Sequence, residues 1–102
     1  MAAIIHLTEG NFEQEVTNFK GTVLVDFYAD WCGPCKMMAP VVEKVAEAHP
    51  EVKVAKVDVD DQMGLAQKFG VMSIPTLITF KNGVQSEKSV GAISQTQVES
   101  ML

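Results

Sequence analysis

The stretch YADWCGPCKM holds both cysteines and the only tryptophan of the chain. Cys32 and Cys35 are separated by Gly33 and Pro34, and Trp31 stands directly before them. Two thiols at this spacing can form a disulfide with each other. The thiolate of either one is a nucleophile toward other disulfides. The spacing therefore indicates thiol-disulfide exchange.

The cysteine motif lies where an apolar strand ends and a helix is expected to begin. Unpaired backbone N–H groups and the positive end of the helix dipole then face Cys32 and favour its thiolate form. Pro34 suits the first turn of a helix and stiffens the loop between the sulfurs. We therefore expect Cys32 to be the attacking thiol. Cys35, one turn further on and deeper, is expected to resolve the mixed disulfide.

Two other interpretations of the cysteine pair stay open from the residues alone. A zinc site needs two further Cys or His ligands. Only His6 and His49 exist, one on the first strand and one at the far end of the long helix. The cysteines could instead be inert, buried thiols, an interpretation that leaves the Trp-Cys-Gly-Pro-Cys context unexplained. The redox pair is favoured, and no metal site is predicted.

The elements around the motif follow from hydrophobic periodicity and turn residues. Helix starts are assigned to Asn11, to Asp60 or Asp61, and to a capping box at Ser94. The Asn-Gly pair at 82–83 supplies a tight hairpin turn. Strands are predicted at 2–7, 22–29, 52–59, 76–80 and 84–90, and helices at 11–19, from the cysteine motif to 49, at 60–70 and at 94–102.

This order of elements predicts an α/β fold. The first half needs right-handed crossovers between parallel strands, and the hairpin adds an antiparallel edge. The result is a three-layer arrangement around a mixed sheet. A chain of 102 residues predicts a single domain, 1–102, with one core.

Composition excludes several classes of function. The net charge of -5 argues against nonspecific binding to nucleic acid or to an anionic membrane surface. No apolar run is long enough for a membrane span. The first residues show no basic segment typical of a signal peptide, so a cytoplasmic location is expected. Two cysteines cannot build the disulfide framework of a small secreted protein.

The hexapeptide WCGPCK, preceded by VDFYA and followed by IPTLITFKNG and VGA, resembles the thioredoxin family over essentially the whole chain. The resemblance implies a thioredoxin fold, with a central mixed five-stranded sheet flanked by four helices. It also implies a monomeric protein-disulfide reductase that binds no cofactor. Its targets would be disulfide-containing proteins, and an NADPH-dependent thioredoxin reductase would restore the dithiol. Two alternatives stay open: a binding module on the same fold, and an oxidant or isomerase.

Two charged residues join the predicted catalytic site. Asp26 stands in an otherwise apolar strand, so burial is expected to raise its pKa and make it a plausible base near neutral pH. The resemblance implies that Asp26 lies beneath the cysteines and assists deprotonation of Cys35. It also implies that Lys56 lies near that carboxylate, although a solvated strand lysine is an equal alternative.

The Ile74-Pro75 bond is expected to be trans from the residues alone, at the start of a strand. The resemblance implies instead a cis bond that faces the cysteine pair, so that Ile74 can pair main chain to main chain with an extended substrate. The resemblance implies a flat, weakly polar substrate groove formed by Trp31, Gly33, Pro34, Ile74, Pro75, Val90, Gly91 and Ala92.

Overall fold

The computed structural model describes residues 3–102, in which five strands form one mixed sheet in the order β1-β3-β2-β4-β5. β1 and β2 both run parallel to β3, β4 runs antiparallel to β2, and β5 runs antiparallel to β4. The predicted mixed sheet is confirmed. The strands are β1 (Ile5–His6), β2 (Thr22–Tyr28), β3 (Lys53–Asp58), β4 (Thr76–Lys81) and β5 (Val84–Val90).

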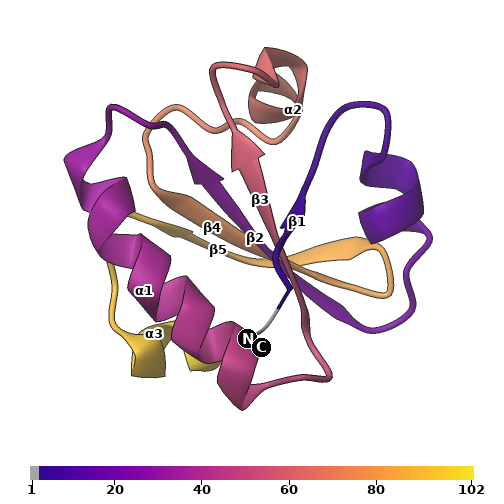
Figure 1. Ribbon diagram of the computed structural model, residues 1–102. Coiled ribbons are helices and arrows are strands. Elements are labelled where there is room, and N and C mark those ends of the chain that lie inside the picture. Colours follow the sequence, from indigo (N-terminus) through magenta and orange to yellow (C-terminus); the bar gives the residue numbers. More distant parts are fainter. Residues whose placement is uncertain (1–2) are drawn as a thin grey trace.

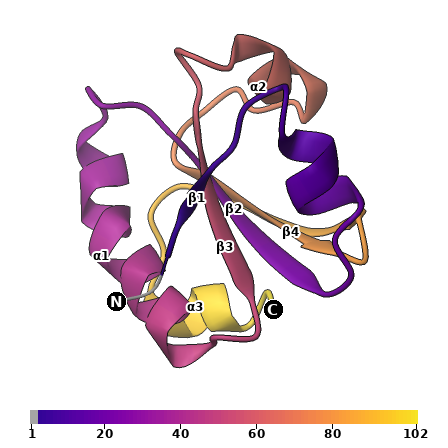
Figure 2. The same ribbon diagram turned by 45° about the vertical axis from the view of Figure 1, so that its right-hand side comes forward.

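Helices cover both faces of this sheet, which gives the three predicted layers (Figures 1 and 2). The helical elements of the described residues are the π-helical turn η1 (Glu13–Thr17), α1 (Gly33–Ala48), α2 (Met63–Lys68) and α3 (Gln95–Glu99). One face of the sheet is covered by α1 and α3, and the other by η1 and α2.

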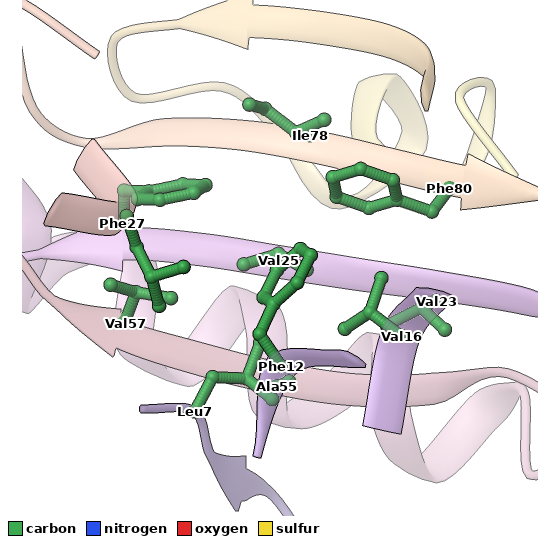
Figure 3. Close-up of a cluster of buried hydrophobic side chains, with 11 residues drawn as sticks. Leu7, Phe12, Val16, Val23, Val25, Phe27, Ala55, Val57, Ile78 and Phe80 are labelled. Carbon is green, nitrogen blue, oxygen red and sulfur yellow. The ribbon is translucent and has the colours of Figure 1, made fainter. Parts of the chain in front are cut away.

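The central strand β2 is buried on both sides, as its unbroken run of apolar residues predicts. Val23, Val25 and Phe27 point toward η1 and α2, where Phe12 and Val16 pack against them (Figure 3). Leu24 belongs to the opposite cluster, beneath α1. Because successive side chains of a strand point to opposite faces, Asp26 lies on the α1 face together with Leu24.

The N-terminal elements are shorter than predicted. Of the predicted strand 2–7, only Ile5 and His6 pair with β3, and residue 2 lies outside the described residues. The predicted helix 11–19 reduces to the five residues of η1. So short a turn gains little from helical propensity, and its geometry follows from the burial of Phe12 and Val16. Asn11 does not cap it: the Asn11 side-chain oxygen accepts from the N–H of Thr8 instead.

The other turn signals gave mixed results. Asn82 and Gly83 both have positive φ, which confirms the tight hairpin turn. The capping box at Ser94 is confirmed. The prediction that Asp60 or Asp61 caps α2 is wrong, because Gln62 occupies the N-cap position and makes no side-chain cap. The Asp60 carboxylate accepts a hydrogen bond from Trp31 instead.

Candidate active site

Cys32 and Cys35 are joined by a disulfide at the point where the chain passes from β2 into α1, with their Cα atoms 5.2 Å apart. Cys32 is the N-cap residue of α1, and its Sγ accepts a hydrogen bond from the backbone N–H of Cys35 at 3.2 Å. Pro34 lies in the first turn, as predicted. The sulfur of Cys32 therefore faces the positive end of a 16-residue helix.

The two cysteines are almost equally buried. Cys32 is 4% exposed and Cys35 is 5% exposed, so the expectation that Cys35 is clearly the deeper of the two is wrong. The reason is local: the N-cap side chain of Cys32 folds back over the first turn of α1. Both cysteines pack with Ala29, and Ile74 lies against the same cluster.

Asp26 is buried, as predicted, and is 1% exposed. Its side chain lies on the face of the sheet that α1 covers. Neither carboxylate oxygen has a hydrogen-bond partner among residues 3–102. Burial raises the pKa of Asp26 from 3.8 to about 6, against the opposing effect of the positive charge on Lys56. A carboxyl group with this pKa can accept a proton near neutral pH.

Lys56 lies directly opposite Asp26 in the register of β2 and β3. Its side chain is half-buried, and its Nζ lies 5.2 Å from the centroid of the Tyr28 ring. Because neither oxygen of Asp26 accepts a hydrogen bond from any residue in 3–102, Lys56 acts on this carboxylate through its charge rather than through a direct ion pair. The structure therefore favours the placement implied by the resemblance over a fully solvated lysine.

The Ile74-Pro75 peptide bond is cis, as the resemblance implied and contrary to the expectation from the residues alone. The carbonyl oxygen of Ile74 lies 3.9 Å from Sγ of Cys32. The next carbonyl, that of Pro75, accepts a hydrogen bond from the N–H of Gly91 at 2.8 Å. Two segments distant in sequence thus meet beside the disulfide.

The residues of the predicted groove lie on three segments of the chain: 31–34 at the cysteine motif, 74–75, and 90–92. Trp31 is 71% exposed and Val90 is 58% exposed, whereas Pro75 is buried. Gly33, Pro34 and Ala92 are exposed, and Ile74 and Gly91 are half-buried. The Trp31 indole N–H donates to Oδ2 of Asp60 at 2.9 Å. This contact was not predicted, because Asp60 was expected to begin a helix.

Other kinds of site find little support in the described part of the chain. Among residues 3–102, no three His, Cys, Asp or Glu side chains are grouped so that they could hold a metal ion. Within the same residues, no helix is both long and apolar enough to cross a membrane. An open hollow of about 770 Å³, lined by Phe19, Ala46 and Val52 among others, includes none of the predicted site residues.

Comparison with known proteins agrees with this geometry. The family model described as Thioredoxin matches residues 3–102. A thioredoxin of Alicyclobacillus acidocaldarius is 50% identical over 101 residues, which are 98% of this chain and 95% of that protein. A thioredoxin of Pseudomonas aeruginosa is 44% identical over 97% of this chain and 93% of its own length. One of Haemophilus influenzae is 43% identical over 100% of this chain and 96% of its own length.

Proposed function

The chain belongs to the thioredoxin family and is a thiol-disulfide oxidoreductase, and we propose that Cys32 attacks the disulfide of a target protein while Cys35 resolves the product. The observation that carries this proposal is the disulfide between Cys32 and Cys35 at the N-terminus of α1. The fold also contains a buried carboxylate, Asp26, that has no hydrogen-bond partner among residues 3–102. An inert pair of thiols would need neither feature.

The reaction starts from the dithiol form. The Cys32 thiolate attacks one sulfur of the target disulfide, forms a mixed disulfide and releases the other target sulfur as a thiolate. Cys35 then loses its proton and attacks Sγ of Cys32. The second target sulfur leaves, so the target gains two electrons and two protons and this protein is left with the Cys32-Cys35 disulfide.

Asp26 is proposed to accept the proton of Cys35, and Lys56 to moderate its basicity. A pKa of about 6 supports this role, because the carboxylate form is present at neutral pH and is still basic enough to take a proton. The opposing charge of Lys56 keeps that pKa from rising further. The proton passes through water, since Asp26 makes no hydrogen bond to either cysteine.

The substrate is proposed to be an extended segment of a protein that carries a disulfide. We propose that the exposed residues Trp31, Gly33 and Pro34 on one side, and Val90, Ala92 and the half-buried Gly91 on the other, flank the disulfide and form the groove. Ile74 and Pro75 lie between them, and the Ile74 backbone would pair with the main chain of the substrate. Main-chain pairing suits a protein that reduces many different targets.

Turnover requires a source of electrons outside this chain. We propose an NADPH-dependent thioredoxin reductase as that partner, with no cofactor held by the chain itself. We further propose that the protein is a monomer that works as a single domain, 1–102. The cytoplasm is the proposed compartment, because its thiols are kept reduced and a reductant is useful there.

A trapping experiment tests the assignment of the two cysteines. The Cys35→Ser variant is expected to accumulate a mixed disulfide with insulin, because Cys32 can still attack and nothing resolves the product. The matched Cys32→Ser variant is expected to trap none, and both variants lose turnover with dithiothreitol as reductant. Trapping by Cys32→Ser, or turnover retained by Cys35→Ser, would contradict the proposed roles.

A further inference from the structure

A ring of contacts passes through the redox residue Cys32. The ring passes from Cys32 to the Ile74 carbonyl, 3.9 Å away, and from the Pro75 carbonyl to the N–H of Gly91 at 2.8 Å. It closes through a less common contact, in which the backbone N–H of Ile93 donates to Sδ of Met38 at 3.4 Å. Met38 lies on α1, three residues after Cys35, and so returns the ring to the redox helix.

Met38 is a member of this ring to which the proposed mechanism gives no role. Its side chain is 1% exposed and belongs to the apolar cluster beneath α1. An apolar side chain of similar volume, such as leucine, would fill the same space. Leucine offers no acceptor, however, whereas a thioether sulfur is a weak one. Replacing Met38 with leucine therefore removes the hydrogen-bond acceptor but keeps the side-chain volume, so the two roles can be tested separately.

The backbone N–H of Ile93 has the Met38 sulfur as its hydrogen-bond acceptor. Among residues 3–102 it has no other hydrogen-bond partner, and the Ile93 residue is half-buried. A partly buried donor that loses its acceptor also loses the stabilisation of that hydrogen bond until water reaches it. Without the sulfur, the loop 91–93 would gain by moving toward water, away from α1.

We propose that Met38 is a positioning residue for substrate binding: its sulfur holds the loop 91–93 against the redox helix, so that Gly91 and Ala92 are presented in a fixed geometry to an extended protein substrate. This inference rests on the proposed function of the groove. Gly91 has a φ of +97°, a conformation suited to glycine. A residue with a side chain at position 91 would not readily adopt the same loop conformation. Ordering the loop in advance lowers the cost of ordering it when substrate binds.

The test compares the Met38→Leu variant with the wild type in the oxidised state. Amide hydrogen exchange at Ile93, followed by NMR, is expected to become about three- to tenfold faster, the range that corresponds to one lost hydrogen bond. The KM for insulin is expected to rise about two- to fivefold with kcat unchanged. The rate with a small aromatic disulfide is expected to stay the same, because such a substrate does not need the loop.

Met101→Leu is the matched control. Met101 lies in the same buried cluster, but its sulfur accepts no hydrogen bond within residues 3–102. This variant loses the same chemical group and is expected to leave both the Ile93 exchange rate and the KM unchanged. If Met38→Leu folds poorly, protein labelled with norleucine in place of methionine provides the exchange measurement, since a methylene then replaces each sulfur with little change of shape.

Each outcome bears on the inference. Unchanged exchange at Ile93 in Met38→Leu or in the norleucine protein would overturn it, because the sulfur would then not hold the loop. Faster exchange with an unchanged KM would also overturn it, because the ordered loop would not serve substrate binding. The exchange measurement needs no substrate, so its failure is distinct from a failure of the cysteine trapping experiment.

Discussion

Asp26 and Lys56 are register partners on the adjacent strands β2 and β3, and the charge of Lys56 acts on the Asp26 carboxylate. The carboxylate is fully enclosed and has no hydrogen-bond partner among residues 3–102, while the lysine is half-buried and reaches toward Tyr28. Burial raises the pKa of Asp26, and the lysine charge opposes that rise. Burial of Asp26 and the charge of Lys56 together set the pKa of Asp26, the group that the proposed mechanism uses as its base.

Removal of the lysine charge should raise the pKa of Asp26 further. In the Lys56→Met variant, NMR titration of the Asp26 carboxyl carbon is expected to show a midpoint above the wild-type value of about 6. Lys53→Met is the control, because Lys53 pairs with Glu15 on the opposite face of the same strand. An Asp26 midpoint that does not move in Lys56→Met would mean that the lysine charge is screened by water.

Burial of Asp26 should make the protein less stable as the pH rises. The pKa of Asp26 is raised on folding, so the native state binds more protons than the unfolded state between pH 3.8 and about 6, and the free energy of unfolding falls across that window. With about 1.4 kcal/mol for each pKa unit, the loss amounts to about 3 kcal/mol.

The Asp26→Asn variant tests this dependence. Its stability relative to the wild type is expected to improve by about 2 to 3 kcal/mol between pH 4 and pH 7, measured by urea unfolding of the oxidised proteins. Asp61→Asn, which changes an exposed carboxylate, is the control variant. A constant difference between Asp26→Asn and the wild type at all pH values would contradict the raised pKa.

The same substitution should slow the resolving step and spare the attacking step. In Asp26→Asn, decay of the mixed disulfide with insulin at pH 7 is expected to be at least about tenfold slower, because Cys35 loses its proton acceptor. Formation of the mixed disulfide should proceed at the wild-type rate. Rapid quenching and separation of the mixed disulfide measures both steps, and an unchanged decay rate would remove Asp26 from the mechanism.

The hydrogen bond between Trp31 and Asp60 should restrain the indole beside the active site. In Asp60→Ala, the fluorescence anisotropy of Trp31 is expected to fall, and the signal is unambiguous because the chain has one tryptophan. The KM for insulin should rise about two- to fivefold. Asp61→Ala, which changes the neighbouring carboxylate, should alter neither quantity.

The interaction of His49, at the end of α1, with Glu99, in α3, should stabilise the fold in a pH-dependent way. Its Nε2 lies 2.9 Å from Oε2 of Glu99 and its Nδ1 lies 3.4 Å from Oε2 of Glu51. The hydrogen bond to Glu99 raises the pKa of His49 above 6.5. The stabilisation is therefore complete below pH 6.5 and is lost as the pH rises through the folded-state value.

Comparison of His49→Gln with the wild type isolates this effect. The stability difference between the two proteins, measured by urea unfolding, is expected to be largest near pH 5.5 and to shrink by pH 8.5. His6→Gln, which changes an exposed histidine on β1, is the control variant. A difference that grows with pH would mean that neutral His49, rather than the charged form, is the stabilising species.

Much of the fold follows from local signals in the sequence. The apolar run of β2, the Asn82-Gly83 turn and the Ser94 capping box each act over a few residues, and each was predicted correctly. The predictions that were wrong, such as the caps at Asn11 and Asp60, concern side chains with several possible partners. The hydrogen-bond partner that such a residue finds in the folded protein depends on distant parts of the chain.

The redox pair, its place between a strand and a helix, and the burial of Asp26 can be predicted from residue types and short-range periodicity. The contacts of Trp31 with Asp60, of Ile74 with Cys32 and of Ile93 with Met38 cannot, because they form only in the folded chain. These contacts join residues 29, 42 and 55 positions apart. No local propensity encodes them, since they arise only when the packed sheet brings its loops to one edge.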